Sequence, residues 1–264
     1  GREGAVMEGY YIVRNKDIDV KYDENGFFRT EVLAGSYDGG IRNFKCFLKA
    51  GMECSPELYQ DKTVVYMFGK GRGYVTDEKE AHNITELSFY LPDFDKVPFT
   101  IHAVDDMEFI MSVVDMNPWD KERFEHSHLH LPFFMKYTDG QVYDQDCKGP
   151  NTTSWQIIGP GQMGRILMGV VRAVGEGTDE KGHPTVAQWN YSVGSAEFHL
   201  SVDHQEPITQ YGGDFSFVPA GPDHSLIADP GKEVFYVWYE HYTRERDFMV
   251  TLAKGDRLED KLKH

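Results

Sequence analysis

The residue best placed to do chemistry ends a glycine- and proline-punctuated stretch near the C-terminal third of the chain. Gly213 is followed after five residues by Pro219, after one more by Gly221, and after two more by His224. Gly213 and Asp214 predict a tight turn, because glycine tolerates positive φ and an aspartate side chain bonds its own backbone. A strand should follow, and Pro219 to Gly221 should bend the chain before His224 enters the next strand. An imidazole at such a corner is a candidate metal ligand.

This spacing resembles the second conserved motif of the cupin superfamily, whose members are small antiparallel β-barrels of the jelly-roll type. The stretch from Gly175 to Gly194 is similar to the first cupin motif, with His183 and Gln188 at the positions of the second histidine and the carboxylate. The resemblance implies that His183, Gln188 and His224 point into one barrel and bind a divalent ion such as Mn²⁺, Fe²⁺ or Zn²⁺.

The first motif departs from the cupin pattern at Lys181, where a cupin metal site normally has a histidine. The implied ligand set is therefore one short, and an amide oxygen is a weak ligand for such ions. Lys181 itself is a candidate catalytic residue that could bind a substrate carboxylate. The alternative is an exposed lysine in a charged loop beside Asp179 and Glu180.

A histidine-rich segment near the middle of the chain could supply the missing ligand. In an extended strand His126, His128 and His130 would share one face, and neutral imidazole is a common ligand of zinc and related ions. Neighbouring histidines on one strand face lie roughly 7 Å apart, so all three rarely bind one ion. We expect either hydrogen bonds to acidic neighbours such as Glu122, or metal ligation by His128 with His130 as an acid–base group at the pocket mouth.

Composition limits the class of protein. The 264 residues include 40% hydrophobic and 14% aromatic residues, which is ample for buried cores. The formal charge of −16 argues against nucleic acid or an anionic membrane as a partner, because phosphate binding depends on lysine and arginine. Three widely spaced cysteines do not suggest a disulfide framework. No stretch approaches the roughly 18 apolar residues of a membrane span, and no leader is evident, so we expect a cytoplasmic protein.

An internal repeat organises the chain. A strand, loop, strand and glycine turn at 49–69 correspond to the stretch 173–194, and His102 follows a proline as His224 does. Short alternating strands separated by turn signals predict an all-β protein with two tandem jelly-roll antiparallel β-barrels, similar to the bicupins. We expect a first barrel at 1–122, a linking segment at 123–150 and a second barrel at 151–264. The charged tail at 243–263 should form a C-terminal helix.

The two barrels differ in the side chains that could form a pocket. The first has lost most metal-ligand types and leaves His102 nearly alone, so we expect that barrel to be structural or assembly-forming. In the second, the two-residue period of a strand carries Asn190 inward if Gln188 points inward. Phe217 and Trp238 could wall a substrate cavity there, although core packing explains aromatic residues equally well.

Two classes of function remain open. The first is the one that the resemblance to the bicupins implies, a small-molecule enzyme with its pocket in the second barrel. It would be a metal-assisted isomerase or hydrolase acting on a sugar-like, uronate-like or ureido compound, with a metal-dependent dioxygenase as a further alternative. The second is a barrel that binds a ligand or assembles without catalysing a reaction. Edge strands in either case favour a homodimer or a higher homo-oligomer.

Overall fold

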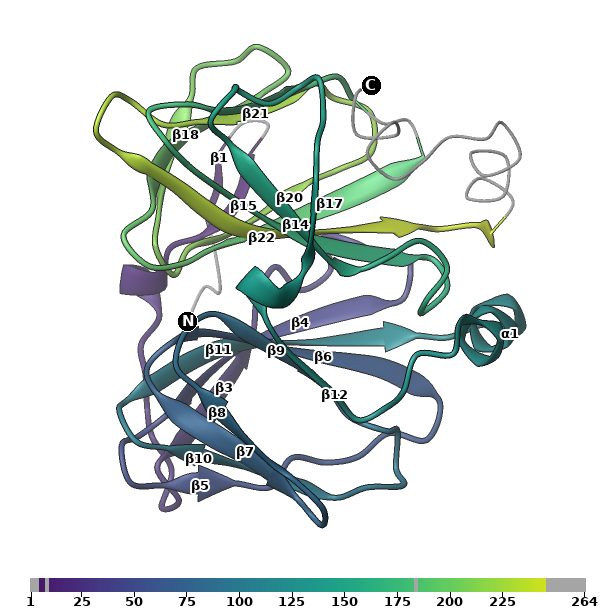
Figure 1. The fold of residues 1–264 in the computed structure, drawn as a ribbon. Coiled ribbons are helices and arrows are strands. Elements are labelled where there is room, and N and C mark those ends of the chain that lie inside the picture. The colour runs from purple at the N-terminus through teal and green to yellow at the C-terminus, as the bar shows by residue number, and fades with distance from the viewer. Residues whose placement is uncertain (1–4, 8–9, 183–184, 246–264) are drawn as a thin grey trace. The chain divides into compact units, whose positions relative to one another are not determined.

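The computed structural model describes residues 5–7, 10–182 and 185–245, and the chain divides into two compact units. Unit 1 is formed by Lys16–Asn117 and Leu129–Asp139, and unit 2 by Gly4–Asn15, Pro118–His128 and Gly140–His264. Each unit is built mainly from two antiparallel β-sheets, as the labelled strands of Figure 1 show. The expected all-β class is therefore present.

Unit 1 contains a six-stranded and a four-stranded sheet. In spatial order the larger sheet consists of β12 (Phe133–Lys136), β9 (Ser88–Leu91), β6 (Lys62–Lys70), β11 (Met107–Asp115), β4 (Ile41–Leu48) and β3 (Phe27–Glu31). The smaller sheet consists of β5 (Glu53–Cys54), β10 (Phe99–Ala103), β7 (Gly73–Asp77) and β8 (Ala81–Ile84). Side chains on the facing surfaces of the two sheets form one hydrophobic core that includes Tyr66, Phe68, Ile101 and Phe109.

Unit 2 contains an eight-stranded and a four-stranded sheet. The larger consists of β1 (Ala5–Met7), β2 (Tyr10–Val13), β20 (Phe215–Val218), β17 (Val186–Ser192), β22 (Glu233–Tyr242), β15 (Ile166–Val174), β14 (Thr153–Ile158) and β13 (Gln141–Tyr143). The smaller consists of β16 (Gly177–Glu180), β21 (His224–Ile227), β18 (Glu197–Val202) and β19 (Ile208–Tyr211). Strands β17 and β22 carry runs of buried residues, as expected for strands covered on both faces.

The first strands of the chain belong to unit 2 and not to the barrel that follows them in sequence. Strand β2 pairs with β20 in an antiparallel ladder. The Asp214 carboxylate then fixes the end of this segment, because it accepts a hydrogen bond from the Asn15 backbone N–H at 2.9 Å and pairs with the Arg14 guanidinium at 3.0 Å. This placement differs from the expected range of the first barrel, which began at the N-terminus.

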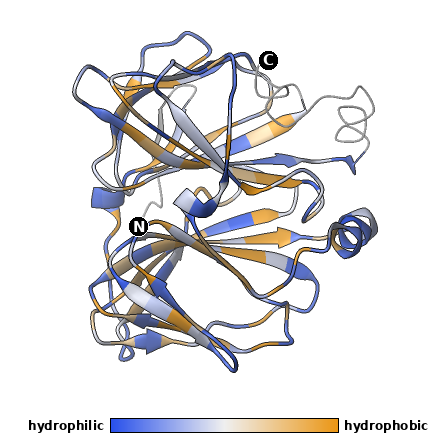
Figure 2. Ribbon diagram, in the orientation of Figure 1, coloured by the Kyte–Doolittle hydropathy of each residue, from blue (hydrophilic) through white to orange (hydrophobic). Residues whose placement is uncertain are grey.

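The α-helix that the structure describes, α1 (Pro118–Ser127), is internal. Proline at the first helical position has its φ already set for a helix, and Asn117 before it is a favoured N-cap residue. Figure 2 shows α1 largely in the hydrophilic colour, whereas orange, hydrophobic stretches lie on the strands. The expected C-terminal helix at 243–263 falls almost entirely outside the described residues. Across the described residues, no helix is long and apolar enough to pass through a membrane.

Candidate active site in unit 2

His224 and Glu180 form a buried ion pair inside the barrel of unit 2. His224 begins β21 after the bend at Gly221, whose φ of 119° suits glycine, and Glu180 ends β16 directly opposite it. His224 Nε2 lies 2.8 Å from Glu180 Oε2, and the two side chains are only 2% and 6% exposed. The predicted bend at Pro219–Gly221 therefore delivers the imidazole to the barrel interior, where it meets a carboxylate.

Two opposing effects act on the imidazole of His224. Burial by itself lowers its pKa, but the hydrogen bond and the negative charge of Glu180 outweigh burial, so the pKa of His224 is raised above its ordinary value. Nδ1 on the other side of the ring lies 3.4 Å from the carbonyl oxygen of Pro222. With Nδ1 oriented by this carbonyl, Nε2 is the nitrogen that faces the barrel interior and can carry a transferable proton.

The larger sheet turns a row of polar side chains toward the same interior. Gln188 on β17 pairs with Glu240 on β22, and Asn190 pairs with Ser216 on β20 and with Trp238 on β22, so these five side chains share one face of the sheet. All five are buried. A polar row at the centre of a buried sheet is unusual for a purely structural core, in which apolar side chains dominate.

This row is tied together by hydrogen bonds. Gln188 Nε2 donates to Asn190 Oδ1 at 2.9 Å, Asn190 Nδ2 lies 3.4 Å from Ser216 Oγ, and Ser216 Oγ donates to Gln210 Oε1 at 2.8 Å. Gln188 Oε1 is buried and has no hydrogen-bond partner among the residues that the structure describes. The amide oxygen is therefore an available acceptor at one end of an otherwise ordered polar network.

The rest of the interior is shaped by aromatic and small polar groups. Trp238 Nε1–H donates to the Tyr143 hydroxyl at 3.1 Å, and the Tyr236 hydroxyl lies 3.2 Å from Thr178 Oγ1. Cys147 Sγ lies 3.9 Å from Glu180 Oε1, and burial, reinforced by the Glu180 charge, raises the pKa of this thiol to about 12. Cys147 is therefore a neutral thiol at physiological pH and not a thiolate nucleophile.

Among the predicted substrate contacts, Asn190 and Trp238 lie on the inward face of the sheet and Phe217 does not. Phe217 pairs with Trp189 on the opposite face, where their ring centroids are 5.0 Å apart. Trp189 stacks in turn on Tyr239, with ring centroids 5.3 Å apart. The two-residue period of β20 explains this placement, because Ser216 takes the inward position before Phe217. Phe217 is therefore a packing residue, and its assignment to the substrate cavity was wrong.

Glu180, the residue immediately before Lys181, was not among the predicted site residues. Alternation along β16 buries Thr178 and Glu180, whereas Lys181 follows the strand and is exposed. The signal for this was present, since Glu180 precedes the expected ligand position by one residue and a strand reverses its face at every step. His183 lies outside the described residues, so its predicted role as a ligand is untested.

The expected histidine strand is wrong. His126 lies in the last turn of α1 with its side chain 73% exposed, and its Nε2 is 4.0 Å from Glu122. His128 follows the helix with a φ of 60°, and both His128 and His130 are exposed. The helix that begins at Pro118 includes His126, the first of the three histidines that were expected on the strand. The three imidazoles therefore do not project from one strand face.

His102 is placed on the outer side of its strand in unit 1. Along β10 the buried positions are those of Ile101 and its alternating neighbours, while His102 is half-buried and stacks on Tyr74 with ring centroids 4.3 Å apart. Its Nε2 lies 2.8 Å from Thr76 Oγ1 and its Nδ1 lies 3.0 Å from Glu53. His102 thus belongs to a hydrogen-bonded surface cluster and not to a barrel pocket.

The described residues do not by themselves fit a Mn²⁺, Fe²⁺ or Zn²⁺ ion. No group of three or more His, Cys, Asp or Glu side chains within the described ranges is arranged to hold a metal. His224 and Glu180 supply one nitrogen and one carboxylate oxygen, and the Gln188 amide oxygen is a weak third donor. Such an ion would need a further ligand, for which His183 was the predicted source.

Comparisons with solved structures identify the architecture. A Pseudomonas aeruginosa protein with the provisional name glyoxylate-induced protein superposes with a TM-score of 0.69 over 92% of this chain and 92% of its own, at 12% identity. Lactobacillus farciminis oxalate decarboxylase, in a complex with formate, matches with a TM-score of 0.64 over 92% of this chain and 89% of its own, at 12% identity. A cupin 2 conserved barrel domain protein of Leptotrichia buccalis matches with a TM-score of 0.57 over 86% and 93%, at 16% identity.

The fold is that of a bicupin. The expected resemblance is thereby confirmed at the level of architecture, because identities this low show the fold alone. No family model matches the sequence. No curated protein matches it either. The bicupin fold is shared by enzymes and by proteins without an assigned activity, so the fold alone does not determine the function.

Proposed function

We propose that this bicupin is a small-molecule enzyme whose reaction centre is the barrel interior of unit 2, with His224 and Glu180 as its acid–base pair. The buried ion pair at 2.8 Å carries the proposal. Burying two charges is costly, and well-packed apolar residues often stabilise a fold equally well or better. A buried pair beside an ordered polar network therefore indicates a functional role.

The pair suits a reaction in which a proton moves between neighbouring atoms of a polar substrate. The Glu180 carboxylate would remove a proton from the hydroxyl-bearing carbon next to a carbonyl group, and the His224 imidazolium would protonate the carbonyl oxygen, which gives an enediol. Glu180 would then return its proton to the former carbonyl carbon while the neutral His224 takes the proton of the other hydroxyl group, which completes an isomerisation. The Gln188 amide oxygen and the Asn190 side chain would bind hydroxyl groups, which favours sugar-like or uronate-like substrates.

Hydrolysis of a ureido compound uses the same two groups differently. Glu180 would take a proton from an attacking water, and His224 would protonate the departing nitrogen. A metal ion bound by His183, Gln188 and His224 is an alternative arrangement, and this ligand set stays a prediction. Such an ion would supply Lewis-acid polarisation of a carbonyl, and His224 would then be a neutral ligand in place of a proton donor. The acid–base roles of His224 and Glu180 depend on their contact at 2.8 Å and include no step through a metal.

The test follows proton exchange and turnover directly. The wild-type protein is incubated in D₂O with a panel of aldoses, uronic acids and ureido acids, and ¹H NMR records loss of C–H signals and appearance of product. We expect exchange or turnover with at least one member of the panel, and a loss of about 10²–10⁴-fold in Glu180→Gln and His224→Asn. Elemental analysis of the wild type, His183→Ala and His224→Asn shows whether a metal is bound.

His102→Gln is the matched control, because His102 is also paired with a glutamate, Glu53, but lies in unit 1. It should retain wild-type turnover. Full activity in Glu180→Gln, or neither exchange nor turnover with any compound of the panel, would overturn the proposed acid–base role.

Non-catalytic ligand binding is the second candidate, and the hydrogen-bonded row from Gln188 to Gln210 favours it, because such a preordered wall can orient a ligand without reacting. Saturable binding of a panel compound without exchange or turnover would support it. We also propose a homodimer in the cytoplasm, to be checked by light scattering and by cell fractionation.

A further inference from the structure

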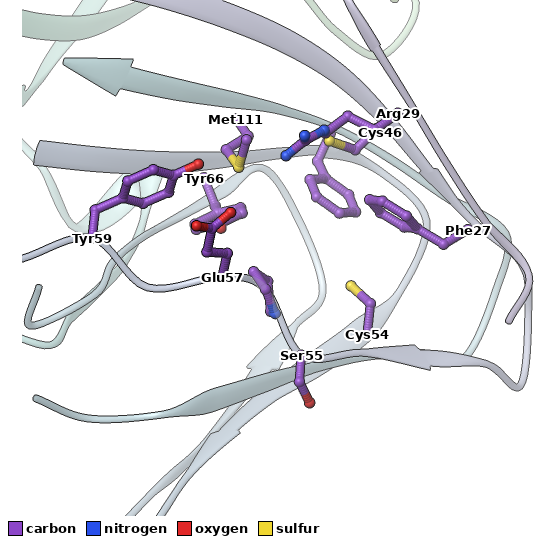
Figure 3. Close-up of a pocket in the computed structure, with 11 residues that line it drawn as sticks. Phe27, Arg29, Cys46, Cys54, Ser55, Glu57, Tyr59, Tyr66 and Met111 are labelled. Carbon is purple, nitrogen blue, oxygen red and sulfur yellow. The ribbon is translucent and has the colours of Figure 1, made fainter. Parts of the chain in front are cut away.

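A second candidate site lies inside unit 1, within the barrel that was expected to be structural. A cavity of about 230 Å³ lies between the core and the segment that follows β5. Its apolar walls include Phe27, Phe109 and Met111. Figure 3 shows polar groups among these walls, and they come from Arg29, Cys46, Cys54, Ser55, Glu57, Tyr59 and Tyr66.

Tyr66 is the most informative of these residues. It lies on β6 opposite Met111 of β11, in the hydrophobic core, and only 1% of it is exposed. Its hydroxyl is buried and has no hydrogen-bond partner among the described residues. Buried hydroxyl groups in proteins are nearly always bonded, so an orphaned one at a cavity wall indicates a ligand or solvent that completes it.

Arg29 brings a positive charge to the same cavity. It lies on β3 directly opposite Cys46 of β4, so the two side chains share the inward face of the sheet. The Arg29 guanidinium lies 4.6 Å from the centre of the Phe44 ring, which restrains its direction, and Arg29 is an exposed residue that lines the cavity. A donor at the mouth and a hydroxyl inside can therefore act on one ligand.

The Tyr66 hydroxyl is a neutral hydrogen-bond donor, and the positive charge that acts on it is that of Arg29. Burial, reinforced by neighbouring groups, raises the pKa of Tyr66 well above its ordinary value, so the hydroxyl keeps its proton. The positive charge of Arg29 has the opposite effect and lowers the pKa of Tyr66. Burial raises the pKa of Cys54 to about 12, and it also raises the pKa of Cys46. Both thiols are neutral, so they place no negative charge beside the hydroxyl and are poor nucleophiles.

We propose that the unit 1 cavity binds a small monocarboxylate with an apolar body. One carboxylate oxygen accepts a hydrogen bond from the Tyr66 hydroxyl, and the carboxylate pairs with the Arg29 guanidinium at the mouth. The apolar body packs between Phe27, Phe109 and Met111. The cavity is smaller than the roughly 300–1,000 Å³ of sites for drug-sized ligands, so the body is about one ring in size.

This site is independent of the reaction proposed for unit 2. It needs no proton transfer and no metal, and the neutral thiols leave it without an activated nucleophile. Its role is binding, and its failure or success does not bear on His224 and Glu180.

Isothermal titration calorimetry with benzoate and its neutral analogue benzamide tests the proposal. We expect saturable binding of benzoate to the full-length protein, with benzamide at least tenfold weaker. Tyr66→Phe and Arg29→Gln should each weaken benzoate binding about tenfold, as expected for a lost hydrogen bond or ion pair to a charged group. Glu57→Gln removes a like charge at the mouth and should leave benzoate binding unchanged or tighter.

Arg42→Gln is the matched control, since Arg42 stacks on the same Phe44 ring, at 5.1 Å, but does not line this cavity. It should bind benzoate within twofold of wild type. Tyr66→Phe should keep or raise the melting temperature without ligand, because it removes an unpaired buried hydroxyl, so weakened binding cannot be ascribed to unfolding. Equal affinity for benzoate and benzamide, no measurable benzoate binding, or weaker binding in Glu57→Gln would overturn the proposal.

Discussion

Asp120 on α1 and Arg165 before β15 form a buried, multiply bonded ion pair. Arg165 donates to the carboxylate from Nε at 3.1 Å and from Nη2 at 2.8 Å, and its backbone N–H adds a further bond at 3.0 Å. The Arg165 and Asp120 side chains are only 9% and 3% exposed. The Asp120–Arg165 pair connects α1 to the larger sheet of unit 2, and the Asp120 carboxylate that forms it is buried.

Removing the carboxylate should destabilise the protein strongly. Asp120→Ala leaves the Arg165 guanidinium buried without its counter-charge, and we expect a loss of about 3–5 kcal/mol in the free energy of unfolding. Urea denaturation followed by circular dichroism measures it. Glu197→Ala breaks the exposed pair with Lys232 and serves as the control, with an expected loss of at most about 1 kcal/mol. Similar losses in the free energy of unfolding in both variants would show that the buried Asp120–Arg165 pair stabilises the protein no more than an exposed ion pair does.

His241 should make the protein sensitive to mild acid. Burial, reinforced by the Arg165 charge, lowers the pKa of His241 to about 3 in the folded protein. In the unfolded chain the imidazole of His241 takes up a proton near its ordinary pKa of about 6.5. Protonation therefore favours the unfolded state, and the free energy of unfolding, which is highest above pH 6.5, decreases as the pH falls toward 3. Between pH 7 and pH 5 the loss is about 2 kcal/mol.

Urea denaturation of the wild type and of His241→Gln at pH 7 and pH 5 checks this sign. The difference between the two pH values should be smaller in His241→Gln by about 2 kcal/mol. An unchanged difference would mean that His241 does not resist protonation in the folded state.

Gly169→Ala should disturb the wall of the unit 2 interior. A Cβ at this position would lie 2.5 Å from Trp238 Cζ2 and 2.8 Å from the carbonyl oxygen of Trp155, so backbone and indole must shift. We expect a destabilisation of about 1–3 kcal/mol and altered tryptophan fluorescence. Val174→Ala, at an exposed site on the same strand, should change stability by no more than about 0.5 kcal/mol. Unperturbed fluorescence in Gly169→Ala would contradict the close packing of Trp238.

The His224–Glu180 pair should be dispensable for folding but not for activity. His224→Leu alone leaves a buried carboxylate without its partner and should cost about 3–5 kcal/mol. The double variant His224→Leu with Glu180→Leu removes both charges and should recover most of that stability while remaining inactive. Thermal denaturation and the exchange assay measure the two properties separately, and a double variant as unstable as the single one would assign the pair a structural role.

The sequence allowed the corner of the second barrel to be predicted, because glycine and proline have few permitted conformations in such a turn. The bend at Gly221 follows from residue type, and the inward direction of His224 follows from the resemblance to the cupin motif. The inward pairing of Gln188 with Asn190 followed from the two-residue period of a strand. These are local properties, and they carry over into the folded protein.

Other features depend on contacts that local patterns do not encode. Strand alternation could have placed Glu180 on the inward face, but its pairing with His224 depends on another strand. Phe217 was put on the wrong face because an aromatic cavity wall was assumed in place of the strand period. The histidine segment was misread because Pro118 starts a helix that ends at Ser127. The cavity at Tyr66 requires knowledge of how two sheets pack, which no single strand reveals.

The pairing of β2 with β20 in the larger sheet of unit 2 affects the order in which parts of the chain can fold during translation. Asn15 and its anchor Asp214 are 199 positions apart, so at ribosomal rates of roughly 5–20 residues per second the first strand leaves the exit tunnel tens of seconds before its partner β20 exists. The residues of unit 1 are all translated within that interval. Strand β2 can therefore pair with β1 but not yet with β20, and the barrel that holds the proposed reaction centre closes only after the residues of unit 1 have been translated.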